Sequence, residues 1–235
     1  MTQPTEKQIQ KQTIEWFSGT KSFSKVMTKR GYKTLTIDNK PELSPDVCLD
    51  LLNLEIEQEE CFIFWASPPC TAFSVASIST HWKGGKNAYI PKSETALLGL
   101  KLLEKTIQYI SIVRPKIWFI ENPRGVMRKV IDDIFRKYGI KDYKRHTVTY
   151  CQYGDNRMKP TDIWTNSENW IPKKMCKNGD KCHVSAPRGS KTGTQGLKNA
   201  KDRGVIPESI FIEILNSEEV KQEAMQSQAR HSSQA

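Results

Sequence analysis

The fold is decided by the stretch Phe64-Trp65-Ala66-Ser67-Pro68-Pro69-Cys70-Thr71-Ala72-Phe73-Ser74, in which an apolar run ends in two prolines and a cysteine. Residues 61–65 have the pattern of a buried strand, and two consecutive prolines can continue neither a sheet nor a helix. Cys70 is therefore expected on a stiff turn just beyond a strand, where an open α/β sheet places its chemistry. A lone cysteine is more often a small buried hydrophobe, but rigid prolines and small polar neighbours favour a reactive thiol.

A strand, a tight turn and a helix are predicted upstream, over residues 13–30. The next predicted strand, 34–37, ends in Asp38, which lies 19 positions after Gly19. A carboxylate at the end of a second strand is the group that binds ribose hydroxyls in nucleotide-type cofactor sites. These residues predict a cofactor site, with a surface turn and an ordinary helix cap as the alternative.

Apolar runs and their breakers predict the remaining elements. Residues 75–92 have no periodicity, so we expect a structureless, mobile loop beside Cys70. The leucines of the helix predicted at 94–113 are expected to be largely buried. Alternating strands and helices predict an α/β fold with a doubly wound, mostly parallel sheet. The further expected strands are 46–50, 116–120, 146–150 and 161–165, and the further expected helices are 94–113, 126–138 and 205–215.

A second reactive side chain, Glu121, comes directly after the strand predicted at 116–120. Glu121 could simply cap the helix that follows it. However, the carboxyl ends of neighbouring parallel strands meet at one edge of a sheet, where ligands bind. Glu121 and Cys70 are therefore expected to converge.

The charge of the chain is unevenly distributed. The net charge is +10 over 235 residues, and residues 157–203 hold eleven Lys or Arg against four Asp or Glu. A charge run is usually a solvated face, but a basic, Gly-rich segment after the reactive stretches indicates a polyanion such as nucleic acid. The expected organisation is a catalytic domain of residues 13–165 plus 204–216, a small basic inserted lobe of 166–203, and polar, flexible termini of 1–12 and 217–235.

Cysteine usage and hydropathy predict the compartment. No stretch is apolar enough to span a bilayer, and the opening residues 1–7 contain no signal-peptide core. We therefore expect a cytoplasmic protein of a bacterium or a phage-infected cell, with no membrane partner and with its six cysteines reduced. Cys176, Cys182 and His183 suggest zinc, but Cys-x5-Cys-His matches no common finger and no fourth ligand is evident, so we expect a polar loop without metal.

Taken in order from Thr13 to Leu215, these stretches resemble the cytosine-C5 DNA methyltransferase family. The specific match is Pro68-Pro69-Cys70-Thr71-Ala72-Phe73-Ser74, which looks like the Pro-Cys nucleophile motif. The other motifs follow in the order of the family. Phe17-Ser18-Gly19 resembles the first cofactor motif, and Asp38 and Asp50 resemble the residues that contact the ribose and the adenine. Glu121-Asn122 resembles the Glu-Asn-Val motif, Arg157-x-Lys159 resembles the Gln-x-Arg-x-Arg motif, and residues 204–215 resemble the closing helix.

The resemblance implies a Rossmann-like class I methyltransferase fold and S-adenosyl-L-methionine as the cofactor. Cytosine C5 is a poor nucleophile, so the Cys70 thiolate must first add to C6. Glu121, when protonated, is expected to donate to N3, while Arg157 orients the ring carbonyl and Lys159 supports it. The cofactor-binding residues implied by the resemblance are Phe17, Ser18, Gly19, Thr20, Lys21, Asp38, Asn39, Asp50 and Pro68.

The resemblance also implies double-stranded DNA as the partner, because these atoms are reached only when the cytosine is flipped out of the duplex. The lobe 166–203 occupies the position of the target-recognition region and would contact phosphates. Lys21 replaces a glycine of the cofactor turn, where its side chain could either pair with the cofactor carboxylate or crowd the site. A monomer is sufficient for acting on one base at a time, and the sequence identifies no restriction-enzyme partner.

Three other functions share features with these motifs. Methylation of an exocyclic amino group needs a stacking aromatic and an acceptor amide or carboxylate, which Ser67 and Cys70 do not supply. RNA cytosine-C5 methylation uses the same thiol chemistry on another polymer. A catalytically inactive nucleic-acid-binding protein on this scaffold would have no need of Cys70, Glu121 and Arg157 together.

Overall fold

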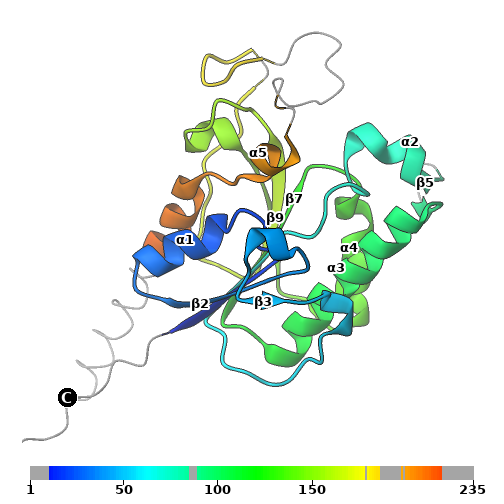
Figure 1. Cartoon of the computed structure of the whole chain (residues 1–235). Helices are drawn as coiled ribbons and strands as arrows, with labels where there is room; N and C mark the ends of the chain where they lie inside the picture. Colours follow the sequence, from blue (N-terminus) through cyan, green and yellow to red (C-terminus); the bar gives the residue numbers. More distant parts are fainter. Residues whose placement is uncertain (1–10, 85–88, 178, 186–196, 198, 219–235) are drawn as a thin grey trace, which may run out of the picture.

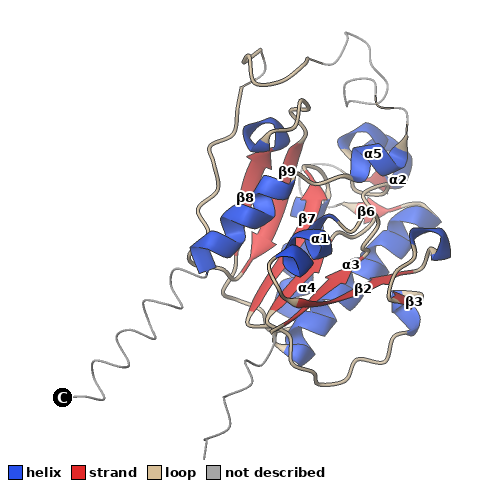
Figure 2. Ribbon diagram, turned by 60° about the vertical axis from the view of Figure 1, so that its left-hand side comes forward, coloured by secondary structure: helices blue, strands red, loops and turns tan. Residues whose placement is uncertain are grey.

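The computed structural model describes residues 11–84, 89–177, 179–185, 197 and 199–218. A seven-stranded sheet with the order β3-β2-β1-β4-β7-β9-β8 forms its centre (Figures 1 and 2). The strands of this sheet are β1 (Gln12–Trp16), β2 (Lys33–Asp38), β3 (Val47–Cys48), β4 (Ile63–Ala66), β7 (Ile117–Pro123), β8 (Lys144–Thr149) and β9 (Pro160–Thr165).

The sheet is mostly parallel, as the sequence predicts. β1 pairs in parallel with both β2 and β4, and the parallel set continues to β3 on one side and β7 on the other. Only β9 runs antiparallel, between β7 and β8. The chain winds outward from β1 to β3 and then crosses to β4, so the strand order reverses between β1 and β4. This is the doubly wound, Rossmann-like class I methyltransferase arrangement, and its reversal point is where such sheets bind ligands.

Helices cover both faces of the sheet, because successive side chains of each strand point to opposite faces. In β4, Phe64 and Ala66 join the core under α3 (Glu94–Val113) and α4 (Met127–Lys137), while Ile63 and Trp65 join the core on the other face. That second face is covered by α1 (Ser22–Lys29) and by the helix over residues 208–218, which lie together on the left of Figure 1.

The residues after Cys70 are more ordered than the sequence predicts. They form a 3-10 turn, the short helix α2 (Ile78–His81), and a hairpin of β5 (Trp82–Lys83) with β6 (Ile90–Pro91). The buried Trp82 anchors this segment, since its indole Nε1 donates to the Ala72 carbonyl at 2.6 Å. The expectation of a structureless loop is therefore wrong for the described part of 75–92.

A second correction concerns α3, which has the predicted bounds. Its leucines are not all buried: Leu97 and Leu98 are each 48% exposed, while Leu102 and Leu103 face the sheet. A helix against one side of a sheet buries only one stripe of its surface.

Short elements complete the described chain. They are four 3-10 turns, at Pro41–Leu43, Leu51–Asn53, Val75–Ser77 and Tyr150–Tyr153, and the helix α5 (Ala200–Gly204). Residues 178, 186–196 and 198 of the basic lobe lie outside the described residues, as do 1–10 and 219–235 of the predicted termini. The described ends of these termini are ordered, since Gln12 begins β1 and residues 217–218 end a helix. Among the described helices, none has the length and apolar character required to cross a membrane.

Candidate active site

Cys70 lies on a turn at the carboxyl end of β4, as expected, and is exposed. The turn is closed by the backbone amides of Phe73 and Ser74, which both donate to the Cys70 carbonyl at 3.0 Å. The fully buried Asn122 fixes its start, because its Nδ2 donates to the Pro68 carbonyl at 2.8 Å. The end of β7 therefore holds the nucleophile turn in place.

A close backbone approach at Gly125 locks the same two loops together. Ser74 and Gly125 form an antiparallel bridge, and the Val126 amide donates to the Phe73 carbonyl at 2.8 Å. A Cβ atom on Gly125 would lie 2.0 Å from that carbonyl oxygen, so only glycine fits here. The sequence analysis did not identify this residue; a glycine just after a reactive strand end was its one signal.

Glu121 is carried into the site by β7, which extends to Pro123 through pairing with β9. Its carboxylate is buried and accepts a hydrogen bond from the Tyr150 hydroxyl at 3.0 Å. Burial, with the Glu121 charge adding to it, raises the pKa of Tyr150 well above its ordinary value. Tyr150 therefore stays protonated and orients Glu121, a role that the sequence analysis missed because Tyr150 ends an ordinary strand pattern.

Lys159 brings a cation to the same place. Its Nζ lies 4.6 Å from the centre of the Tyr150 ring and donates to the Arg203 carbonyl at 2.9 Å. Burial lowers the pKa of Lys159, and the negative charges of Glu121 and Cys70 oppose this shift. For the Cys70 thiol, desolvation by the surrounding protein and then the Glu121 charge raise the pKa, while the Lys159 charge lowers it. Cys70, Glu121 and Lys159 thus form one electrostatic cluster.

Arg157 makes its hydrogen bonds within the protein. Its Nε donates to both carboxylate oxygens of Asp155, at 2.9 and 2.8 Å, and its Nη2 donates to Asp155 as well. The other donors reach the backbone carbonyls of Asp202, Arg203 and Val205 at 3.0 to 3.2 Å. All five N–H groups of the guanidinium are therefore engaged within the protein.

A contact of Arg157 with a substrate carbonyl stays a prediction, and it would require one of these hydrogen bonds to be released. The Arg157 guanidinium is buried and fastens the end of α5 to the loop before β9. Lys159, two residues further along, is the cation that faces Cys70 and Glu121.

The residues expected to bind the cofactor lie along the same edge of the sheet. Phe17 to Lys21 follow β1, Asp38 and Asn39 end β2, Asp50 follows β3, and Pro68 follows β4. Gly19 has a left-handed φ of 47°, and its amide donates to Asp38 Oδ2 at 3.0 Å. This bond fixes the first turn to the end of the second strand.

The turn has the properties of a polar ligand site. The Ser18 hydroxyl is buried and has no hydrogen-bond partner within the described part of the chain, so a bound polar group would satisfy it. Asp50 accepts a hydrogen bond from the Leu52 amide at 3.0 Å and caps a 3-10 turn. The Lys21 ammonium donates to the Ser44 carbonyl, so it already has a partner on the β2–β3 connection.

The structure also gives the predicted zinc candidates a fourth member. Cys151 lies beside Cys176, Cys182 and His183, and their ligand atoms all lie within 4.8 Å of one another. The expectation of a plain polar loop does not account for this convergence.

Comparison with known proteins gives the following relationships. No family model matches the chain. A prophage-encoded E. coli protein named as a DNA modification methyltransferase superposes with a TM-score of 0.49 and 15% identity, over 71% of this chain and 52% of that one. The Entamoeba histolytica methyltransferase EhMeth superposes with a TM-score of 0.47 and 18% identity, over 72% of this chain and 57% of that one. The chain therefore spans about half the length of these solved structures.

A viral relative is more similar in sequence. The protein of Frog virus 3 (isolate Goorha) named "Probable DNA (cytosine-5)-methyltransferase" is 28% identical over 220 residues, which cover 86% of this chain and 98% of the relative. The Pro-Cys turn and the Glu-Asn strand end meet in the structure at adjacent parallel strands, β4 and β7. Together, the similarity along almost the whole relative and this arrangement of motifs support the resemblance of the chain to the cytosine-C5 DNA methyltransferase family.

Proposed function

We propose that this protein methylates C5 of cytosine in double-stranded DNA through a covalent adduct on Cys70, with S-adenosyl-L-methionine as the methyl donor. The observation that carries this proposal is the convergence of Cys70, Glu121 and Lys159 at the ends of β4, β7 and the loop before β9. A thiol, a carboxyl group and a cation are the groups that addition to a pyrimidine ring requires.

The residues would act in sequence. The Cys70 thiolate, stabilised by the Lys159 charge, adds to C6 of the flipped cytosine. Glu121, held by Tyr150, donates a proton to N3 as negative charge develops in the ring, so that C5 becomes nucleophilic. Once C5 carries the methyl group, loss of its proton to a base, expulsion of Cys70 as a thiolate and return of the N3 proton to Glu121 would restore the aromatic ring.

The methyl donor would bind along the ends of β1 to β4. S-adenosyl-L-methionine supplies a methyl group on a positively charged sulfur, which the activated C5 can attack. Asp38 would bind the ribose hydroxyls and Asp50 the adenine, and the Ser18 hydroxyl, which has no hydrogen-bond partner in the described part of the chain, would offer a further polar contact. These residues lie beside Pro68, so donor and nucleophile share one edge of the sheet.

DNA would be held by the basic lobe. Lys174, Lys177 and Lys181 are exposed on its described part and can contact phosphates. Base flipping and action as a monomer are part of the proposal. Methylation of cytosine in RNA is the second candidate, because the thiol adduct forms by the same chemistry on DNA and on RNA.

The decisive experiment is covalent trapping on DNA that contains 5-fluorocytosine, because the fluorine cannot leave and the adduct persists. We expect a denaturation-resistant complex that requires S-adenosyl-L-methionine and is absent in Cys70→Ser. Cys48→Ser, which removes another exposed cysteine, is the matched control and should still be trapped.

Two other outcomes would redirect the proposal. Trapping on 5-fluorocytosine RNA but not on DNA would favour the RNA enzyme. Tight binding of DNA and of the methyl donor without any adduct would indicate an inactive scaffold.

A further inference from the structure

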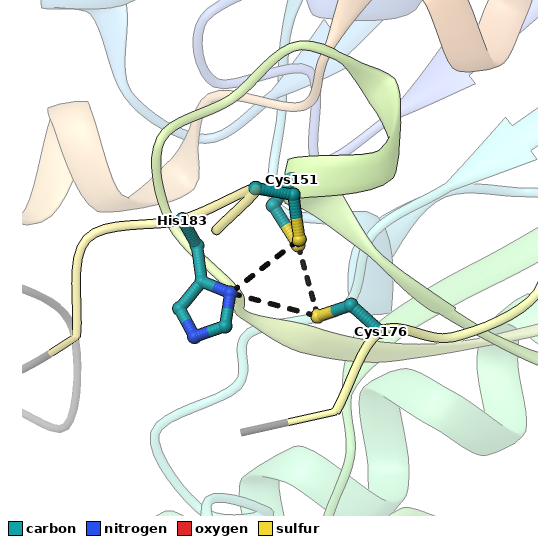
Figure 3. Close-up of side chains that lie close together, drawn as sticks. Cys151, Cys176 and His183 are labelled. Atoms are coloured by element: carbon teal, nitrogen blue, oxygen red, sulfur yellow. Dashed lines mark hydrogen bonds between the residues drawn. The ribbon is translucent and has the colours of Figure 1, made fainter. Parts of the chain in front are cut away.

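Four metal-binding side chains converge outside the active site. Figure 3 labels three of them, Cys151, Cys176 and His183. Cys151 belongs to the 3-10 turn after β8, whereas Cys176, Cys182 and His183 come from the basic lobe. Cys151 and Cys176 are 25 positions apart, and the chain between them includes all of β9, so only the fold brings these groups together. Two of the cysteines are buried, and the segment carries few apolar residues that could explain the association by packing alone.

Three of the four distances that follow are close to the edges of a tetrahedral metal site, the Cys151–Cys176 distance is shorter, and all the ligand atoms lie within 4.8 Å of one another. The sulfur of Cys151 lies 3.1 Å from that of Cys176 and 3.6 Å from that of Cys182. Nδ1 of His183 lies 3.7 Å from the sulfur of Cys176 and 3.6 Å from that of Cys182. With metal bonds of about 2.3 Å to sulfur and about 2.0 Å to nitrogen, a tetrahedron has edges of about 3.8 and about 3.5 Å. A disulfide would need sulfur atoms about 2.05 Å apart.

The donor set selects zinc. Three thiolates and one imidazole suit a borderline-soft cation, and hard cations such as magnesium or calcium prefer oxygen ligands. Binding would release the thiol protons and leave a net charge of about −1 on the site. The Gln152 side-chain amide donates to the sulfur of Cys182 at 3.4 Å, a hydrogen bond that favours the thiolate. Four protein ligands close the coordination sphere, which is the property of a structural site.

The cluster is joined to the active site by short links. The Cys176 amide donates to the Thr149 hydroxyl at 3.0 Å, and the Val184 amide donates to the Asn156 carbonyl at 2.9 Å. Asn156 lies in the loop that carries Arg157 and Lys159. On the other side, Cys151 directly follows Tyr150, the residue that orients Glu121.

We propose that Cys151, Cys176, Cys182 and His183 bind one structural zinc ion, which fastens the basic lobe to the loop that carries Lys159. The metal would fix a segment that has almost no regular secondary structure, and so hold its lysines at a constant position relative to the catalytic cluster. This inference rests on the ligand geometry and holds whether the substrate is DNA or RNA.

The test is the metal content of the full chain, purified without an affinity tag and dialysed against EDTA. We expect about one zinc ion per chain by plasma mass spectrometry. The double variant C182A/H183A, which changes one exposed and one half-buried side chain, should lose the metal while circular dichroism shows a folded protein. Cys48→Ser, which lies outside the cluster, should retain it.

Cobalt substitution identifies the ligands directly. The wild-type protein should give the intense visible absorption of tetrahedral thiolate-bound Co²⁺, and Cys151→Ser and Cys176→Ser should each weaken it. Absence of zinc from wild-type protein expressed in zinc-supplemented medium would overturn the proposal. So would a Cys151–Cys176 disulfide found by peptide mass spectrometry in protein purified under reducing conditions, or equal zinc content in C182A/H183A and wild type.

Discussion

At the scale of single residues, Lys159 is the group whose charge tunes the nucleophile. Its positive charge lowers the pKa of Cys70 against the opposing effects of desolvation and Glu121. We expect Lys159→Met to raise the pKa of Cys70, so that alkylation by iodoacetamide needs a higher pH. The measurement is the pH profile of alkylation at Cys70, followed by peptide mass spectrometry. Lys101→Met, on the exposed side of α3, is the control, and a profile shared by both variants would contradict the role of Lys159.

Tyr150 provides a second test at this scale, because its hydroxyl is the group that holds Glu121. Tyr150→Phe removes one hydrogen bond to the proposed proton donor, so we expect the rate of adduct formation to fall on the order of tenfold. Tyr153→Phe is a matched control: Tyr153 lies on the same 3-10 turn, but its hydroxyl donates to Glu213 on the closing helix. Equal rates in the two variants would rule out a special role for Tyr150.

At the scale of elements, the contact between the nucleophile turn and the loop after β7 depends on Gly125. A methyl group there would overlap the Phe73 carbonyl, so Gly125→Ala must push the two loops apart. We expect a decrease of about 1–3 kcal/mol in the free energy of unfolding, together with slower adduct formation. Urea unfolding and the trapping assay measure both effects. Gly204→Ala, where a Cβ meets nothing within 4 Å, should leave stability nearly unchanged.

The first turn of α1 is hydrogen-bonded to a titratable side chain of β1, Glu15. Glu15 is buried and accepts hydrogen bonds from the amides of Phe23 and Ser24 at 3.3 and 2.9 Å. Burial raises its pKa from 4.5 to about 7. The folded state therefore holds this proton more tightly than the unfolded chain, so the contribution of Glu15 to stability is greatest below pH 4.5 and disappears as the pH rises toward 7.

The expected consequence is a difference between wild type and Glu15→Gln that depends on pH. Relative to the variant, wild type should lose up to about 3 kcal/mol of unfolding free energy between pH 4.5 and 7, with no further change above that range. Urea titrations at a series of pH values measure it. The unfolding free energy of Glu208→Gln, a surface variant, should change with pH in the same way as that of wild type. If the difference between wild type and Glu15→Gln did not change with pH, the Glu15 carboxyl group would be charged throughout this range.

At the scale of the whole molecule, exposed lysines lie both near the carboxyl ends of the strands and near their amino ends. Lys174, Lys177 and Lys181 belong to the basic lobe, near the carboxyl ends of the strands where the active site lies. Changing all three to Gln should weaken DNA binding and make its affinity less dependent on salt. The log–log slope should fall by about 0.9 for each phosphate that the variant no longer neutralises. Fluorescence anisotropy at several salt concentrations gives this slope.

A matched triple variant lies at the opposite edge. Lys33, Lys141 and Lys144 are exposed near the amino ends of strands β2 and β8, away from the active site. Their replacement by Gln removes the same charge and should leave the salt slope close to that of wild type. Equal effects of the two variants would mean that DNA is attracted by net charge alone.

The sequence alone predicted the strands of the central sheet and its longer helices because these depend on local signals. α3 has the predicted bounds, 94–113: the Ser93 hydroxyl accepts the Ala96 amide at 3.1 Å where it begins, and Arg114-Pro115 follows where it ends. Each of the two buried strands ends in a recognisable motif, Pro68-Pro69 or Glu121-Asn122. The sequence therefore also predicted that Cys70 and Glu121 lie at the carboxyl ends of neighbouring strands. Apolar periodicity and helix caps act over a few residues, so they can be recognised without knowing the partners.

Only the tertiary structure decided which polar side chains meet. Arg157 and Lys159 are two residues apart, and nothing local indicates that the first is taken by Asp155 and α5 while the second faces Cys70. In the same way, Cys151 joins the cysteines of the basic lobe only because the end of β8 packs against that lobe. Contacts between distant polar groups depend on how whole elements pack, and a single chain's periodicity reports the burial of each element but not its neighbours.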